Sequence, residues 1–243
     1  MTPEPPAEHH NDPDHASEPA SPIIPHHSMG KLFVKRTFDI IMSFLLLIAL
    51  SPFLLLAALL VAGTSRGGAF FLHERVGRNG RTFKLIKFRS MQAPRTRNDQ
   101  GFEPGDTSRV TAVGSLLRKT KIDELPQLWN VLVGDMSLVG PRPEVPFWTR
   151  VQPERWKPVL SMRPGITDPA SIEFRNEQQI LQEAEDPERC YRDEILPQKL
   201  RLSTKYIETW SFPGDLRILA RTFFALLGMR TGSQQPNTGQ SEP

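Results

Sequence analysis

Residues 40–62 read IIMSFLLLIALSPFLLLAALLVA, an almost unbroken apolar run whose only interruptions are Ser43, Ser51 and Pro52. As a helix rising 1.5 Å per residue, the run would be about 35 Å long, enough to cross a hydrocarbon core of about 30 Å. The apolar core of a signal peptide would be shorter, and a core helix of a soluble protein would carry a polar face. The run therefore predicts a membrane segment.

The Ser51-Pro52 pair stands near the middle of this run. Pro52 removes one backbone hydrogen bond and clashes with the preceding turn, so a kink is expected there, and Ser51 can bond to a freed carbonyl. Basic residues flank both ends, which gives no clear positive-inside orientation. Two alternatives stay open, a kinked spanning helix and a re-entrant helix-break-helix over residues 31–64 that leaves through the leaflet it entered. The flanking residues are Lys31, Lys35, Arg36, Arg66, Arg75, Arg78 and Arg81.

The first thirty residues differ sharply from the rest of the 243-residue chain. They hold seven of the 23 prolines, five of the six histidines, five acidic residues and no Lys or Arg. Such a composition cannot bury enough apolar surface to fold, so residues 1–30 are predicted to be a disordered leader. Without them, 30 basic residues face 22 acidic ones, a net charge of +8 instead of +3. A basic body indicates an anionic partner such as phospholipid, nucleotide or nucleic acid.

Cysteine and histidine counts exclude several classes of protein. Cys190 is the only cysteine, so an intrachain disulfide and a cysteine metal cluster are both impossible. His73 is the only histidine outside the leader, which excludes a His-ligated zinc site in the body of the chain. Disulfide scaffolds, zinc fingers and zinc hydrolases are therefore excluded.

Beyond the apolar run the chain reads as a domain outside the membrane, predicted over residues 65–229 and followed by a polar tail, 230–243. Short β-rich runs and Gly-marked turns among longer polar stretches indicate an α/β domain that is mostly α. Residues 216–229 carry Arg217 and Arg221 on one face, which suits an interfacial membrane helix and a core-facing helix about equally. The expected elements are strands at 69–71 and 82–88 around a turn at 77–80, helices at 112–119 and 123–133, a polar helical region at 175–210 and a loop at 94–109.

Two adjacent carboxylates, Asp123 and Glu124, stand just before Leu125-Pro126. Pro is favoured in a first helical turn, and Thr120 followed by Asp123 resembles a capping box, so both carboxylates are expected at a helix N-terminus that keeps them ionised. An ionised carboxylate can act as a covalent nucleophile or bind a hard cation such as Mg²⁺. Taken alone, however, acidic residues at helix starts are routine partners of the helix dipole.

Basic side chains around the carboxylates raise the case for a catalytic site. Lys87 and Arg89 lie at the end of a predicted strand and Arg118 one turn before the carboxylates, whereas Arg142 stands between two prolines and Arg163 precedes Pro-Gly. An arginine held in a rigid turn flanked by Pro or Gly is a poor candidate for a solvated surface charge alone. Its guanidinium is suited to bind phosphate oxygens through two hydrogen bonds. Together with the carboxylates and a membrane segment, these basic residues predict a site for a phosphorylated substrate at the bilayer surface. Neither GxxxxGK[ST] nor GxGxxG is present, which argues against a P-loop or Rossmann nucleotide site. The predicted phosphate-binding residues are Lys87, Arg89, Arg118, Arg142 and Arg163.

Several ordered motifs resemble one known family. The chain is similar to the bacterial sugar transferases, the monotopic phosphoglycosyl transferases, and in particular to their small, single-domain members. The resemblance covers about residues 31–180. It rests on KRTFD (35–39), SP (51–52), FFLHERVGRNGRTFKLIKFRSM (70–91), TAVGSLLRKTKIDELPQLWNVLVGDMSLVGPRP (111–143) and RPGIT (163–167).

The resemblance implies a reaction, its residues and its location. A phospho-sugar passes from a UDP-sugar to polyprenol (undecaprenyl) phosphate with release of UMP, at the start of lipid-linked glycan assembly such as exopolysaccharide or lipopolysaccharide synthesis. Asp123 would attack the β-phosphate to give a covalent intermediate, Glu124 would bind Mg²⁺, and Ser51-Pro52 would make the helix re-entrant. The catalytic domain would then lie on the cytoplasmic face of the bacterial inner membrane, in contact with phospholipid. Nucleic acid is not an expected partner, and a homodimer stays open.

The sequence departs from the family pattern at two places, and two other hypotheses stay open. Gly67-Gly68-Ala69 replaces the family's Gly-Pro before Phe-Phe, and Asp168-Pro169 follows RPGIT where many members have Gly and an aromatic, so the sugar is not specified. One rival is a metal-dependent transferase with a single displacement, in which Asp123 only binds metal. The other is a non-enzymatic, membrane-tethered protein that binds anions.

Overall fold

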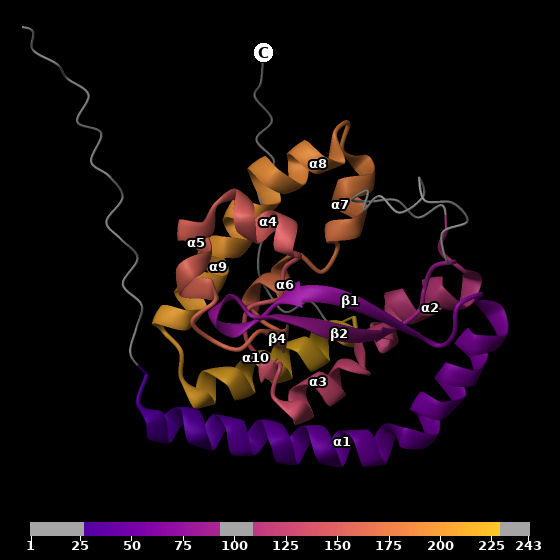
Figure 1. Cartoon of the computed structure of the whole chain (residues 1–243), viewed down its shortest axis with the longest axis horizontal. Helices are drawn as coiled ribbons and strands as arrows, with labels where there is room; N and C mark the ends of the chain where they lie inside the picture. Colours follow the sequence, from indigo (N-terminus) through magenta and orange to yellow (C-terminus); the bar gives the residue numbers. More distant parts are fainter. Residues whose placement is uncertain (1–26, 93–108, 229–243) are drawn as a thin grey trace, which may run out of the picture.

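The structure, a computed structural model, describes residues 27–92 and 109–228 (Figure 1). Most of the predicted leader, most of the predicted loop at 94–109 and the tail at 230–243 lie outside the described residues. The rest is mostly helical with two small sheets, as the sequence indicated. The first helix begins two residues earlier than predicted, at Met29.

Helix α1, Met29–Thr64, is one continuous helix with Pro52 inside it. The expected helix-break-helix is therefore wrong at the level of secondary structure, because the helical hydrogen bonding resumes after Pro52. The ribbon nevertheless bends part-way along, so that its second part rises toward α2 (Figure 1). The Ser51 hydroxyl donates to the Ile48 carbonyl at 2.8 Å, the local bond expected beside a proline kink.

The two limbs of α1 pack against two different parts of the same domain. Residues of the first limb contact the main core, and residues of the second contact a smaller cluster around Phe88 and Leu117. Leu50 is the last residue of the first set and Leu54 the first of the second, so the change of packing partner falls around Pro52. The remaining members are Leu32, Phe38, Met42, Leu46 and Leu47 in the first limb and Ala57, Ala58 and Val61 in the second.

The described residues form two short two-stranded sheets between the helices. Strands β1 (Phe70–Val76) and β2 (Thr82–Phe88) pair antiparallel around a turn, η1 (Arg78–Gly80), which confirms the predicted hairpin with a longer first strand. Strands β3 (Ser137–Val139) and β4 (Gly165–Thr167) pair in parallel. Their three-residue length leaves no alternating pattern to detect, and the sequence did not predict them.

Helices cover both sheets, and proline marks many of their starts. Pro occupies the first or second position of α4, α5, α6, α8, α9 and α10, where its missing N–H costs nothing. The bounds are α2 Ala112–Thr120, η3 Ile122–Glu124, α3 Gln127–Val133, α4 Pro146–Val151, α5 Pro153–Val159, α6 Pro169–Glu173, α7 Glu177–Glu183, α8 Pro187–Cys190, η4 Tyr191–Ile195, α9 Leu196–Glu208 and α10 Phe212–Leu226.

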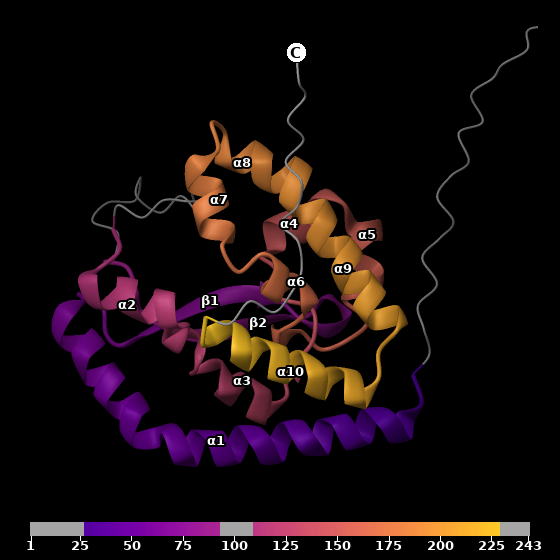
Figure 2. The same cartoon turned by 180° about the vertical axis from the view of Figure 1, so that it is seen from behind.

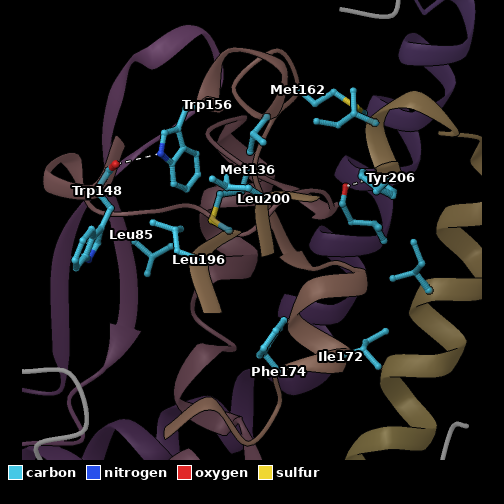
Figure 3. Packing of buried hydrophobic residues seen from close by; sticks show 14 of the residues in the cluster. Leu85, Met136, Trp148, Trp156, Met162, Ile172, Phe174, Leu196, Leu200 and Tyr206 are labelled. Atoms are coloured by element: carbon cyan, nitrogen blue, oxygen red, sulfur yellow. Dashed lines mark hydrogen bonds between the residues drawn. The ribbon is translucent and has the colours of Figure 1, made fainter. Parts of the chain in front are cut away.

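The main core joins the hairpin, β3 and the C-terminal helices (Figure 3). Trp148 and Trp156 are both buried, and the Trp156 indole donates to the Trp148 carbonyl at 3.1 Å. The region 175–210 is helical as expected, but describing it as polar was incomplete, since α9 buries Leu196 and Leu200 in this core.

Helix α10 is amphipathic, and its two faces are compatible with both predicted roles, a core-facing helix and an interfacial membrane helix. Ile218 and Ala225 are buried against the domain, while Arg217 and Arg221 are exposed. Figure 2 shows α10 beside the first limb of α1, where the Phe38 and Phe212 rings meet edge to face at 5.3 Å. Large apolar side chains are also exposed on it and just beyond, namely Leu216, Phe223, Phe224, Leu226 and Leu227.

Candidate active site

Asp123 and Glu124 lie on η3, a single 3₁₀ turn between α2 and α3. Lys121 has a left-handed backbone (φ 59°) that ends α2 and redirects the chain into this turn. The predicted helix start at Asp123 is wrong, because α3 begins at Gln127. The predicted capping box is also wrong, since the Thr120 hydroxyl donates back to the Leu116 carbonyl at 2.8 Å.

Asp123 is a buried carboxylate with an unsatisfied oxygen. Its side chain is 5% exposed, and its Oδ1 has no hydrogen-bond partner among the described residues. Burial raises the pKa of Asp123 and the neighbouring Glu124 charge raises it further, while Lys87, Lys121 and Arg118 oppose both effects. Asp123 was expected to be kept ionised by a helix dipole. In the structure, its pKa is instead set by burial and Glu124, which raise it, and by neighbouring cations, which lower it. A buried polar atom without a partner costs about 1–3 kcal/mol, so it requires a functional explanation.

In contrast to Asp123, Glu124 has both carboxylate oxygens paired with a cation. Arg142 Nη2 lies 2.5 Å from Glu124 Oε1, and Nη1 lies 3.1 Å from Oε2, so the guanidinium holds the carboxylate in a bidentate pair. Burial favours the neutral acid, but the Arg142 charge and its hydrogen bonds outweigh burial and lower the pKa of Glu124 to about 2. The adjacent carboxylates therefore differ, with Glu124 firmly ionised and Asp123 more basic.

Close backbone packing places Arg142. Gly140 donates to the Thr167 carbonyl at 3.0 Å, and Gly165 donates to the Pro141 carbonyl at 2.9 Å. A Cβ on Gly165 would lie 2.1 Å from the Gly140 nitrogen, so only glycine permits this approach. The Gly-Pro-Arg-Pro run is thereby pinned to the chain before β4.

Two more of the predicted phosphate ligands, Lys87 and Arg118, affect the pKa of Asp123. Lys87 on β2 is partly buried, and burial together with the Arg75 charge lowers its pKa to about 8. Lys87 Nζ also lies 5.4 Å from the centre of the Phe71 ring. Arg118 on α2 contacts the Met91 sulfur at 3.6 Å. The positive charges of Lys87 and Arg118 both lower the pKa of Asp123.

Arg89 and Arg163 are engaged with main-chain carbonyls instead. Arg89 donates to the carbonyls of Gly67, Gly68 and Phe70 at 2.9–3.2 Å, which fixes the connection between α1 and β1. Arg163 Nε donates to the Gly134 carbonyl, the end of α3, at 3.0 Å. The structure therefore brings together Lys87, Arg118 and Arg142 of the predicted set. Arg163 braces the surrounding backbone, and Arg89 does the same while its guanidinium lies 5.6 Å from the centre of the Phe71 ring that Lys87 also faces.

Sequence reasoning gave no site role to Arg75 on β1. Its side chain is largely buried, its Nη1 donates to the Pro143 carbonyl at 3.1 Å and contacts Glu144 at 3.2 Å, and its Nε has no partner among the described residues. The Arg75 charge lowers the pKa of Lys87, so it belongs to the same cationic surrounding. Strand alternation was the available signal, because Phe71 and Arg75 share one face of β1 and Phe71 pairs with Lys87.

The carboxylate pair is also where a cation would fit. In the described ranges, no group of three or more His, Cys, Asp or Glu side chains converges on one point. Mg²⁺ needs only one or two protein carboxylates, with water and substrate phosphates completing its shell. The lone pairs of Glu124 that Arg142 leaves free would meet that requirement.

Comparison with known proteins identifies the chain. The sequence model described as "Bacterial sugar transferase" matches residues 30–229. The chain belongs to this family. The sugar transferase is 37% identical over 207 residues to the exopolysaccharide production protein ExoY of Sinorhizobium fredii, covering 79% of this chain and 84% of the relative.

Two further relatives carry more specific names. A UDP-glucose:undecaprenyl-phosphate glucose-1-phosphate transferase of Caulobacter vibrioides is 37% identical over 198 residues, 79% of this sugar transferase and 69% of the relative. An undecaprenyl-phosphate galactose phosphotransferase of Salmonella typhimurium is 36% identical over 206 residues, 78% and 40% of the two chains. These relatives differ in the sugar that they are named for.

Proposed function

We propose that this sugar transferase moves a sugar phosphate from a UDP-sugar to polyprenol phosphate, most simply undecaprenyl phosphate, and releases UMP. The observation that carries the proposal is the buried, unpartnered Oδ1 of Asp123 beside a Glu124 carboxylate held by Arg142. The names of the relatives support both the donor and the acceptor. The reaction would begin the membrane stage of exopolysaccharide or lipopolysaccharide synthesis.

The chemistry proceeds by two displacements at one phosphorus. Asp123 Oδ1 attacks the β-phosphorus of the UDP-sugar, the bond to the bridging oxygen breaks, and UMP leaves with that oxygen. An oxygen of polyprenol phosphate then attacks the same phosphorus, which breaks the acyl phosphate bond and returns the Asp123 carboxylate. Lys87, Arg118 and Arg142 supply positive charge for the diphosphate, so the negative charge of the transition state is compensated by groups already in place.

Mg²⁺ is proposed as the cofactor, bound through Glu124 next to Asp123. When bound, it would neutralise diphosphate oxygens as a Lewis acid. Glu124→Gln should lose most activity, because an amide oxygen is a weaker ligand and a weaker partner for Arg142, and higher Mg²⁺ should restore part of the loss. A Mg²⁺ dependence identical to that of the wild type would instead assign Glu124 a structural role.

A re-entrant arrangement of α1 is proposed for the membrane. Of the helices in the described ranges, α1 has the length and apolarity to cross a bilayer. Its two limbs contact the same domain, on either side of Pro52, whereas a straight spanning helix would carry one limb away from that domain. The proposal places the catalytic domain on the cytoplasmic face of the inner membrane, where nucleotide sugars are available. The exposed apolar side chains of α10 would lie against phospholipid.

The deciding experiment measures UMP release from a panel of UDP-sugars, with and without polyprenol phosphate and Mg²⁺, on the full chain in lipid nanodiscs. We expect release to require the acceptor for turnover, and a phosphosugar on Asp123 to accumulate when the acceptor is withheld. Turnover without any trapped adduct would favour the single-displacement rival. Absence of UMP release from every UDP-sugar would overturn the proposed donor.

A further inference from the structure

The KRTFD run at residues 35–39 has no role in the reaction proposed above, yet its charged side chains turn inward. Lys35 is 7% exposed and Asp39 2% exposed, although they lie on a helix whose surface is largely apolar and exposed. Lys31, one turn earlier, is exposed. Burying an ionised side chain is costly unless it is paired and hydrogen-bonded, so these two residues require specific partners.

Lys35 has its partners at the end of β3 and on α10. Its Nζ donates to the Val139 carbonyl at 2.8 Å and to Asp215 Oδ2 at 2.6 Å. Asp215 is held in turn by the Tyr206 hydroxyl at 2.7 Å and the Trp210 indole at 3.1 Å. The Lys35 charge is therefore compensated inside a satisfied network that fixes the last residue of β3.

Asp39 holds the other two residues of the same strand. The Leu138 amide donates to Asp39 Oδ1 at 3.1 Å, and the Ser137 hydroxyl donates to Oδ2 at 2.8 Å. Together, Lys35 and Asp39 contact every residue of β3. Arg142, the partner of Glu124, follows that strand by three residues.

Arg36 holds the segment on the other side of the site. Its guanidinium donates to the Val131 carbonyl at 2.6 Å and to the Leu132 carbonyl at 2.9 Å, both in the last turn of α3, where a cation is favourable. Helix α3 begins three residues after Glu124. One turn of α1 thus contacts both α3, which follows Glu124 in the chain, and β3, which precedes Arg142.

We propose that Lys35, Arg36 and Asp39 form a positioning site through which α1 sets the geometry of the catalytic pair. The inference rests on the proposed function, and these residues act through β3 and α3 without touching substrate. Attraction of Lys35 to lipid headgroups is the competing explanation. It is disfavoured because the ammonium faces Val139 and Asp215.

The test compares Lys35→Met with Lys31→Met, two variants that remove one positive charge from the same end of α1. Both are measured as full-length protein in nanodiscs of one lipid composition, together with Asp39→Asn, which keeps the shape and one acceptor of Asp39. For Lys35→Met and Asp39→Asn we expect kcat to fall about tenfold to hundredfold, with the KM for UDP-sugar changed less than about threefold, because small displacements of catalytic groups cost that much. Lys31→Met should match the wild type.

Hydrogen exchange supplies a readout that does not depend on activity. We expect the amides of residues 137–140 and of Arg142 to exchange faster in Lys35→Met and Asp39→Asn, and at the wild-type rate in Lys31→Met. Equal losses of kcat in the two lysine variants, or wild-type kcat in Lys35→Met, would overturn the inference. If the wild type releases no UMP, the proposed function fails, and the exchange comparison still decides whether α1 holds β3. Unchanged exchange in all three variants would refute that.

Discussion

At the scale of single residues, Asp123 and Glu124 are neighbours in sequence but opposites in environment. Arg142 keeps Glu124 ionised, with a pKa of about 2, whereas burial raises the pKa of Asp123 and leaves one oxygen without a partner. A nucleophile benefits from that difference, since an oxygen held by strong donors would be a poorer electron-pair donor. The unsatisfied atom is thus a cost in stability that the proposed reaction would explain.

Asp123→Asn should abolish transfer without unfolding the protein. The amide keeps the shape but lacks the nucleophilic anion, so we expect a loss of several orders of magnitude, and thermal unfolding at or above the wild-type temperature because a buried charge is removed. Asp135→Asn is the matched control, since Asp135 is exposed. Activity of Asp123→Asn within tenfold of wild type, about 1.4 kcal/mol in the barrier, would rule out Asp123 as nucleophile.

Lys87 should give the enzyme an alkaline limb. Its pKa of about 8 means that the free enzyme loses this positive charge above pH 8, so kcat/KM for the UDP-sugar should fall there. Lys87→Arg should remove the limb, because guanidinium stays charged. Between pH 8 and the usual lysine value of 10.5, the unfolded chain binds the proton and the folded one does not, so this group makes the free energy of unfolding rise with pH. A pH profile identical in the variant would contradict the assignment.

The candidate site was only partly predictable at this scale. Two adjacent carboxylates and an arginine between prolines are visible in the sequence, but their pairing is not, because Arg142 reaches Glu124 from 18 residues away. Arg163 stands beside Pro-Gly and so has a local signal like that of Arg142, yet it binds a carbonyl. A rigid turn indicates that an arginine is held in place, and the fold decides what it faces.

At the scale of elements, the parallel pair β3 and β4 depends on the absence of side chains. Gly165→Ala would put a Cβ 2.1 Å from the Gly140 nitrogen, and backbone atoms cannot swing aside as a side chain can. We expect destabilisation of about 1–3 kcal/mol or more, with a matching loss of activity as Arg142 shifts. Gly63→Ala is the control, since nothing lies within 4 Å of its Cβ and alanine favours a helix. Equal unfolding temperatures for the two variants would disprove the close-contact argument.

Elements with strong local signals were predicted well, and those made by tertiary contacts were not. The hairpin and the long apolar helix have clear patterns and both form, although the helix is continuous where a break was expected. The turn at Asp123 was not predicted, because a left-handed Lys121 and a 3₁₀ turn stand where the first turn of a helix was expected. Neither propensity nor spacing distinguishes a 3₁₀ turn from an α-helical start over three residues.

At the scale of the whole molecule, α1 lies along one side of the domain and bends toward α2 (Figure 1). Its first limb packs on the main core and its second on Phe88 and Leu117, so the domain contacts the helix on both sides of Pro52. The sequence indicated the apolar length and the interruption. It could not reveal that both limbs return to the same domain, because that depends on contacts made far along the chain.

Replacing Ser51-Pro52 by Ala-Leu should convert some molecules to a spanning topology. The change restores the missing backbone bond and removes the proline clash, so a straight apolar helix becomes favoured over a bent one. In the re-entrant arrangement, the chain on both sides of α1 lies in the cytoplasm. The test introduces one cysteine at Ser21 or at Arg66, which is exposed just after α1, in a Cys190→Ser background. An impermeant maleimide is applied to spheroplasts, with lysed spheroplasts as the measure of reactivity.

With Ser51-Pro52 intact, neither cysteine should be labelled until the membrane is broken, since both lie on the cytoplasmic side. In the Ala-Leu variant, position 21 should become accessible in part of the population while position 66 stays protected. The contacts of both limbs with the domain oppose straightening, so conversion should be incomplete and should accompany a fall in activity. Ready labelling of position 21 alone in the chain with Ser51-Pro52 intact would mean that α1 spans the bilayer despite its bend, and the re-entrant proposal would be wrong.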